Sequence, residues 1–174
     1  NTFTSLYFND EDKLGVYTVD GGTDYSFFTT GLFRVTSAWY HIVLSVDTSL
    51  STASDRAKIY VNGVLQAGTA VHGAIPQNYN FHTNSASRIA SYTEGNNHFD
   101  GYMADTYYID GLSLDAASFG EVSSTTNVWT PKAYSGTYGT NGYHLDYSLS
   151  ANPGNDSSGQ DNSFTNNGSL ITVS

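Results

Sequence analysis

The sequence predicts an all-β protein, a sandwich of two antiparallel sheets, from its composition, one hairpin and the spacing of its strands. Its 174 residues include 14 Tyr and 17 Gly, with abundant Ser, Thr and Asn and few helix formers, which is typical of β proteins. A strand from Trp39 to Val46 and a second from Ala57 to Val61 are expected to form a hairpin. The second strand ends at Asn62-Gly63, a strong turn signal because both residues tolerate positive φ.

Short strands separated by turn clusters precede this hairpin at the spacing expected of a sandwich. The turns fall at Asn9–Asp12 and at Gly21-Gly22. The strands expected here are Thr2–Phe8, Leu14–Val19, Tyr25–Phe28 and Leu32–Val35.

Beyond the hairpin the pattern predicts a loop, several further strands and one helical turn. Asp115 can cap the backbone donors of that helical turn. In chain order we expect a loop at Gln66–Ser85, a strand at Arg88–Tyr92, a turn at Glu94–Asn97, the longest strand at His98–Asp110, the helical turn at Leu114–Gly120, and a last clear strand at Tyr143–Tyr147.

The end of the chain is rich in Gly, Asn, Ser and Asp between Asn152 and Gly168. Leu170–Val173 is predicted to be a final short strand or a linker. We therefore expect a β-sandwich domain over residues 1–150 and a tail over residues 151–174.

Charge and composition exclude several classes of function. Six Lys and Arg stand against sixteen Asp and Glu, a net charge of −10, which argues against binding to nucleic acid or to anionic membrane surfaces. The absence of Cys excludes disulfides and thiolate metal sites. No apolar run approaches the roughly 18 residues of a membrane span, so we expect no membrane insertion.

Two segments resemble laminin-G-like, concanavalin A-like lectin domains, and a third resembles a stretch of phage proteins. The hairpin reads WYHIV and then KIYVNG, and residues 99–110 read FDGYMADTYYID. The stretch VWTPKAYSGTYGTNGYHLDYS, residues 128–148, with GNDSSGQDNSFTNNG after it, residues 154–168, is similar to virion-associated proteins of tailed phages, especially marine ones, where such modules sit in fibres or appendages. The resemblance implies a two-sheet antiparallel jelly-roll sandwich.

In this family an opening strand pair usually precedes the region matched by residues 2–35. We expect it to be missing, or to lie on a polypeptide outside this sequence. Unpaired sheet edges invite pairing with another chain. The sequence thus predicts a shortened fold, a fragment, or an edge completed by a neighbouring chain in an oligomeric assembly.

The carboxylates of the expected long strand do not form a catalytic pair. Asp100, Asp105 and Asp110 are each five residues apart, so neighbours point to opposite faces, and the outer two would lie about 33 Å apart along a strand. His41 could form a catalytic triad with Asp47 or Asp105, but no nucleophile elbow accompanies it, and we interpret it as a packed strand residue. We predict no catalytic residues and no enzyme activity.

Calcium is the one cofactor considered, because acidic and Asn-rich loops supply oxygen ligands and the family often holds such an ion. The favoured interpretation of these loops is nevertheless ordinary turns with Asx hydrogen bonds. The candidate ligands are Asp10, Asp12, Asp20, Asp24, Asp156 and Asp161.

Aromatic and Asn-rich loops favour contact with glycans, since sugar rings stack on aromatic faces. For any single Tyr, packing in the core or rim is favoured over this role. The candidates expected to be exposed are Tyr79, Phe81, Tyr92, Asn96, Asn97, Tyr134 and Tyr138. The aromatic residues assigned to the core are Trp39, Tyr60, Phe99, Tyr108, Phe119 and Trp129.

The sequence therefore favours a non-enzymatic lectin-like module, displayed on a phage virion or another extracellular assembly, that binds host glycans or a receptor. The alternative is a structural domain that decorates or cements a capsid, tail or fibre through neighbouring subunits. A glycan hydrolase is the least favoured alternative.

Overall fold

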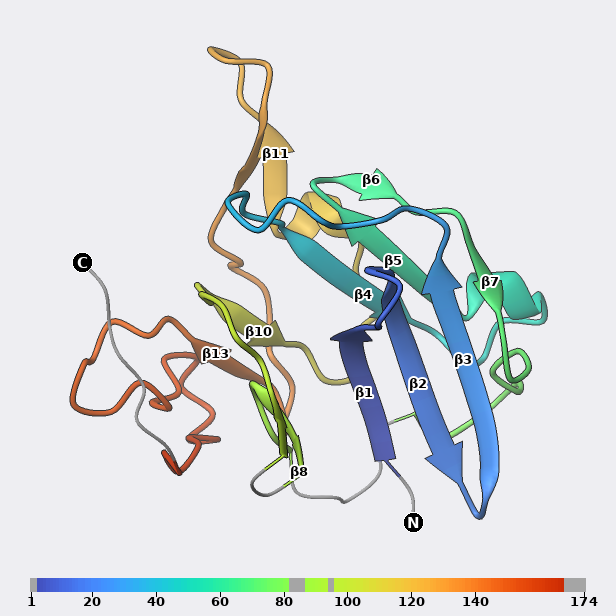
Figure 1. Ribbon diagram of the computed structural model, residues 1–174. Coiled ribbons are helices and arrows are strands. Elements are labelled where there is room, and N and C mark those ends of the chain that lie inside the picture. Colours follow the sequence, from blue (N-terminus) through green and yellow to red (C-terminus); the bar gives the residue numbers. More distant parts are fainter. Residues whose placement is uncertain (1–2, 82–86, 94–95, 168–174) are drawn as a thin grey trace. The chain divides into compact units, whose positions relative to one another are not determined.

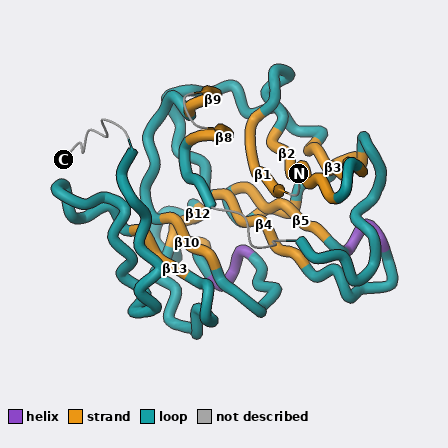
Figure 2. The backbone as a smooth tube through the Cα atoms, turned by 90° about the horizontal axis from the view of Figure 1, so that it is seen from below, coloured by secondary structure: helices purple, strands orange, loops and turns teal. Residues whose placement is uncertain are grey.

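In the computed structural model, which describes residues 3–81, 87–93 and 96–167, the chain is all-β, as predicted. Within these ranges the helical structure consists of two 3₁₀ turns, η1 (Ala53–Asp55) and η2 (Ala116–Ser118), and no helix there is long and apolar enough to cross a membrane. Short strands alternate with long loops (Figures 1 and 2). The strands are β1 (Phe3–Phe8), β2 (Leu14–Asp20), β3 (Thr23–Thr29), β4 (Ile42–Val46), β5 (Ala57–Val61), β6 (Val64–Leu65), β7 (Gly68–Ala70), β8 (Ser91–Thr93), β9 (Asn96–His98), β10 (Thr106–Tyr108), β11 (Gly120–Val122), β12 (Trp129–Pro131) and β13 (Tyr143–Leu145).

The chain forms two compact units. The first unit comprises Asn1–Asn96 and Ser113–Tyr134, and the second comprises Asn97–Leu112 and Ser135–Ser174. The division expected at residue 150 stays a prediction, although residues on both sides of it belong to the second unit.

An antiparallel sheet in the order β1-β2-β3-β7 forms one layer of the first unit (Figure 1). Strands β1 and β2 pair from Phe3↔Val19 to Phe8↔Leu14. The turn between them is closed by the Asn9 side chain, whose Oδ1 accepts hydrogen bonds from the backbone N–H of Glu11 and of Lys13. Asn9 thus satisfies turn donors that the ladder leaves unpaired.

The predicted hairpin forms the second layer, a sheet in the order β4-β5-β6. Strands β4 and β5 pair from Ile42↔Val61 to Val46↔Ala57, which confirms the hairpin. At the next turn Asn62 has φ 49° and Gly63 has φ 80°. These are the positive values for which Asn-Gly is the favoured pair in a two-residue hairpin loop.

The core of the first unit lies between these two sheets. Leu14 of β2 packs in one buried cluster with Ile59 and Val61 of β5, and Val16 packs in another with Ala57. Along β5 these buried residues alternate with Lys58 and Tyr60, which face the opposite side of the sheet. The sheet therefore has one core face and one outer face.

A short hairpin of β11 and β12 carries Trp129, which packs within the first unit. The indole lies so close to Gly63 and Gly120 that a Cβ at either glycine would sit 2.3 Å or 2.5 Å from a ring atom. Its Nε1 donates a hydrogen bond to His41 Nδ1 at 3.1 Å. The ring thus connects this hairpin to the turn between β5 and β6 and to the segment before β4.

The second unit is built around the pair β10 and β13, in register from Thr106↔Leu145 to Tyr108↔Tyr143. Leu145 is almost fully buried and forms an isolated bridge with Asp156. The Tyr108 and Tyr143 rings stack with centroids 5.5 Å apart. Most of the remaining described residues of this unit are in loops (Figure 2).

Several predictions about strands are wrong, among them the strand at Arg88–Tyr92, of which only the last two residues lie in β8. Leu32–Val35 is a loop, and Leu32 and Val35 are exposed. The expected strand His98–Asp110 is interrupted after β9, and β10 begins only at Thr106, because Asp105 has φ 48°, outside the β region. The expected loop at Gln66–Ser85 contains β7, which pairs with β3.

Other predictions about elements are confirmed. The helical turn at 114–120 contains η2, and Asp115 Oδ1 accepts from the Ala117 N–H as its cap. Phe119 is buried, as expected of a core residue. Trp39 and Phe99 are not core residues, since they are 64 % and 45 % exposed.

Candidate functional site

The outer face of the β4–β5 hairpin carries an open groove of about 440 Å³ in the first unit. Strand residues form its floor, and the segments containing η1 and η2 form its sides. It is lined by Ser45, Asp47, Leu50, Asp55, Lys58, Tyr60, Ser113, Leu114, Asp115 and Ser118.

The floor of this groove consists of side chains that the alternation along β4 and β5 directs to the outer face of the sheet. Lys58 and Tyr60 lie two residues apart on β5, opposite in parity to the buried Ile59, and Ser45 of β4 is the register partner of Lys58. Ser45 Oγ lies 2.9 Å from Ser113 Oγ, which fixes the segment before η2 against the sheet. The groove is therefore held by backbone pairing and by a direct side-chain contact.

The lining of the groove contains three carboxylates and one ammonium group, so its net charge is negative. Asp47 Oδ1 accepts from the Ser49 N–H at 3.0 Å and from its hydroxyl at 2.6 Å. Asp115 Oδ1 caps η2, and Asp55 Oδ1 lies 3.2 Å from Lys58 Nζ. Each carboxylate is thus oriented by a contact on its own segment.

This arrangement can bind a small polar ligand. Tyr60 offers an aromatic face for apolar C–H groups, the carboxylates accept hydrogen bonds, and the hydroxyls both donate and accept. Sequence reasoning assigned Tyr60 to the core, which is wrong. The alternation of Ala57, Ile59 and Val61 was the signal that could have placed it on the outer face.

Two of the aromatic glycan candidates contribute to the core, contrary to the exposure expected of them. Tyr79 and Phe81 are half-buried and pack against the cluster of Val16, Ala57 and Ile75. Tyr79 Oη also lies 3.1 Å from Thr18 Oγ1. Packing explains both residues, because an apolar loop that covers a core edge removes its rings from water.

Of the remaining glycan candidates, two have described side chains, and both of these are half-buried. Tyr134 is half-buried, 5.1 Å from Phe119 between ring centroids. Tyr138, in the second unit, is half-buried, and its carbonyl accepts from the Asp110 N–H. The side chains of Tyr92, Asn96 and Asn97 lie outside the described residues.

The calcium candidates form no cluster of three or more acidic or histidine ligands within the described ranges. Asp12 pairs with Arg34 at 2.7 Å. The other early candidates, Asp10, Asp20 and Asp24, are exposed or half-exposed. Asp161 lies at φ 61° in an exposed turn of the second unit.

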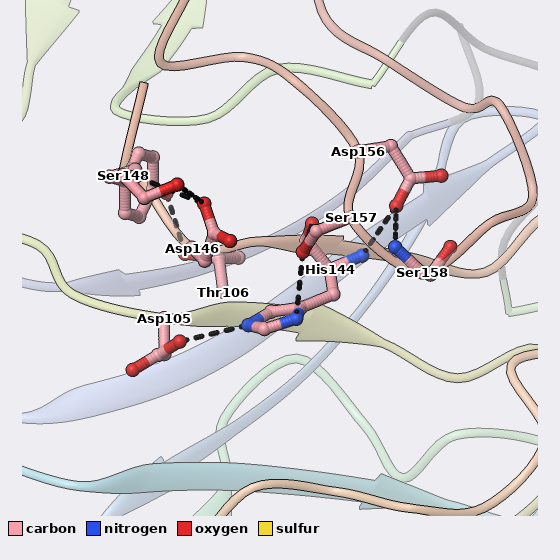
Figure 3. Close-up of polar contacts among 9 residues, drawn as sticks. Asp105, Thr106, His144, Asp146, Ser148, Asp156, Ser157 and Ser158 are labelled. Atoms are coloured by element: carbon pink, nitrogen blue, oxygen red, sulfur yellow. Dashed lines mark hydrogen bonds and ion pairs between the residues drawn. The ribbon is translucent and has the colours of Figure 1, made fainter. Parts of the chain in front are cut away.

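A polar cluster in the second unit, absent from the sequence predictions, surrounds His144 (Figure 3). His144 Nε2 lies 2.8 Å from Asp105 Oδ1, and its Nδ1 lies 3.0 Å from Ser157 Oγ. Its ring stacks on Tyr107 at 4.1 Å. Ser157 Oγ also donates to the His144 carbonyl at 3.0 Å, so this hydroxyl fastens its loop to β13.

Asp156 organises the same loop. Its carboxylate accepts from the backbone N–H groups of His144, Ser158 and Asn162, each at 2.9 Å (Figure 3 shows the first two). Burial acts to raise the pKa of Asp156, but these hydrogen bonds outweigh it and lower the pKa. This candidate calcium ligand is therefore already engaged by loop donors.

Of the groups considered for catalysis, His41 and Asp110 have structural partners. Burial lowers the pKa of His41, against the effect of a backbone hydrogen bond with Phe119, and its Nδ1 accepts from Trp129. Asp110 Oδ2 accepts from the Asn141 N–H and Nδ2. Asp100 is exposed.

Residues 1–111 match a laminin G-type profile of the family described as the Concanavalin A-like lectin/glucanases superfamily. The match covers well over half of the chain and includes the hairpin and residues 99–110. No curated protein and no solved structure matches the chain.

Proposed function

We propose, because the chain belongs to the Concanavalin A-like lectin/glucanases superfamily, that it is a lectin-like module that binds a glycan in the groove on the outer face of β4 and β5. The observation that carries the proposal is the position of Tyr60 in a groove otherwise rich in hydrogen-bonding groups. The groove's volume of about 440 Å³ falls within the range of about 300–1,000 Å³ typical of small-molecule sites.

The chemistry of the lining fits a sugar ring. One face of a hexose presents C–H groups, which pack on the Tyr60 ring. Its hydroxyls donate to Asp47 and Asp115 and accept from Lys58 Nζ. Because these donors and acceptors are fixed by the sheet and by η2, little ordering is needed when the ligand binds.

We propose binding without cleavage of the glycan. Hydrolysis needs one carboxyl group as acid and a second as base or nucleophile. We assign Asp47, Asp55 and Asp115 to binding, because contacts with Ser49, Lys58 and the Ala117 N–H fix the orientation of each carboxylate as an acceptor. Incubation with oligosaccharides should release no new reducing ends, whereas release that Asp47→Asn abolishes would contradict this proposal.

The setting proposed for this binding is the surface of a phage particle or another extracellular assembly, where the module would engage host glycans or a receptor and contact neighbouring subunits. The support is the likeness of residues 128–168 to virion-associated phage proteins. Cross-linking within intact particles that carry the chain would identify such neighbours.

The experiment is a glycan array with the wild-type protein and two variants. Tyr60→Ala should lower binding at least about tenfold, about 1.4 kcal/mol, because it removes the stacking face. Tyr102→Ala removes a 69 % exposed tyrosine outside the groove and should leave binding unchanged. Equal losses in both variants, or no glycan retained by the wild type, would contradict the proposal.

A further inference from the structure

We infer that the groove selects sugars that carry a free ammonium group, that is, hexosamine units whose amine is not acetylated, over neutral and acidic sugars. The inference rests on the proposed function and names its ligand class. It makes Asp47 and Asp115 the residues that determine specificity.

The first step is the charge balance of the lining. Asp47, Asp55 and Asp115 are the acidic residues of the groove, and Lys58 is its basic residue. Asp55 and Lys58 pair with each other, so their charges largely cancel toward a ligand. Asp47 and Asp115 therefore supply the negative potential of the groove.

The second step is the free capacity of these two carboxylates. In each, Oδ1 is the oxygen that accepts from its own segment, from Ser49 in one case and from the Ala117 N–H in the other. Within the described residues, Oδ2 of neither side chain has a partner. An ionised carboxylate has about four acceptor positions, so each keeps acceptor capacity for a ligand.

The third step is the chemistry that such acceptors prefer. An ammonium group has three donors and a positive charge, and its hydrogen bonds to carboxylates are roughly twice as strong as neutral ones. Acetylation removes the charge and two of the donors. A uronic or sialic acid would bring a like charge against Asp47 and Asp115, which disfavours it.

The test compares two ligands that differ only in acetylation: a tetramer of β-1,4-linked glucosamine and the N-acetylated tetramer of the same linkage. Isothermal titration is done at a pH below the pKa of the sugar amine and at two salt concentrations. We expect the free amine to bind at least about tenfold more tightly, with a preference that decreases as salt rises.

The protein's net charge of −10 attracts any cation. Two double variants therefore distinguish recognition in the groove from this nonspecific attraction. Asp47→Asn with Asp115→Asn keeps both Oδ1 acceptors but removes the two charges and the two Oδ2 acceptors. The readout is therefore the ratio of the two tetramers' affinities, which should fall to about one because the charge that favours the free amine is gone. Asp10→Asn with Asp161→Asn makes the same charge change elsewhere and should keep the preference.

The outcomes distinguish this inference from the function on which it rests. Equal affinities, tighter binding of the acetylated tetramer, or equal losses of preference in both double variants would overturn the inference. Binding of neither tetramer, together with an array that retains no glycan, would overturn the proposed function as well.

Discussion

Trp129 shows how a single residue holds the first unit together. Its ring lies against the backbone of two glycines, Gly63 and Gly120, and its indole N–H reaches His41. A half-buried tryptophan buries a large area and satisfies its donor in the same contact. Sequence reasoning expected Trp129 in the core but did not identify β11 and β12, because strands of three residues leave no periodic pattern.

Gly120→Ala should destabilise the protein by roughly 1–3 kcal/mol, because the new methyl group would overlap the Trp129 ring. Gly31→Ala is the matched control. Its added Cβ would meet the flexible end of Gln66 at 3.3 Å and the Phe33 ring at 3.7 Å, an ordinary van der Waals contact, so we expect a change below about 0.5 kcal/mol. Urea unfolding measures both, and equal stability of the two variants would contradict this account of Trp129.

At the scale of elements, the connection between β4 and β5 depends on Arg56. Its buried guanidinium donates to three carbonyl oxygens, those of Leu50, Ser51 and Ile75, each at 2.7 Å. These bonds join the η1 segment to the loop that covers the core. A planar guanidinium can supply several donors in one fixed geometry, which an ammonium group cannot.

Arg56→Lys should therefore cost about 1–3 kcal/mol, since one ammonium group cannot satisfy all three carbonyl oxygens and the contact with Ile75 is buried. Arg34→Lys makes the same change at an exposed pair with Asp12 and should cost about 0–1 kcal/mol. Thermal unfolding of both variants compares them directly. A small effect at Arg56, no larger than that at Arg34, would show that the connection does not depend on this residue.

The sequence allowed prediction of elements with a strong local signal. The β4–β5 hairpin alternates and is followed by Asn62-Gly63, and η2 has an Asp cap; both are present. Strand β7 could not be predicted, because its pairing with β3 is a tertiary contact at Gly68, where the Phe27 ring and the Phe28 carbonyl leave no room for a side chain.

The candidate site was harder to predict than the fold. The groove joins Ser45, Tyr60 and Asp115, which come from three segments whose proximity depends on the folded sheet. Of its lining, only the parity of β5 was readable from the sequence. Likewise, nothing local to His144 indicates Asp105 or Ser157 as its partners.

At the scale of the whole molecule, the two units differ in what stabilises them. The first has two sheets and a core between them. The second relies on stacked tyrosines and on loops held by carboxylates. We therefore expect the second unit to be the more sensitive to pH.

Alkaline pH should destabilise the second unit through Tyr143. Burial, with smaller contributions from Tyr147 and Tyr108, raises the pKa of Tyr143 to about 12, against about 10 in an unfolded chain. The unfolded chain loses its proton first, so this stability is present below pH 10 or so and is lost as pH rises toward 12. Tyr143→Phe should flatten this dependence in near-ultraviolet circular dichroism, and an unchanged alkaline transition would contradict the assignment.

Acid pH should weaken the same unit through Asp156. Burial acts to raise the pKa of Asp156, but hydrogen bonds from backbone N–H groups lower it by more. The carboxylate is therefore protonated less readily in the native state than in the unfolded chain. The stability it gives is present above its unfolded pKa, about 3.9, and is lost as pH falls through the lower folded value. Asp156→Asn should reduce the acid dependence of hydrogen exchange at Ser158 and Asn162, whereas Asp161→Asn should leave it unchanged.

The central claim is that a glycan binds on the outer face of β4 and β5. The most direct measurement is a titration of the isotopically labelled protein with a glycan that the array identifies, followed by amide chemical shifts. We predict shifts concentrated at Ser45, Lys58, Tyr60 and Asp115, with saturation transfer from the Tyr60 ring to the sugar. Shifts confined to other surfaces, such as the loop around Ser157, with none in the groove, would contradict the claim.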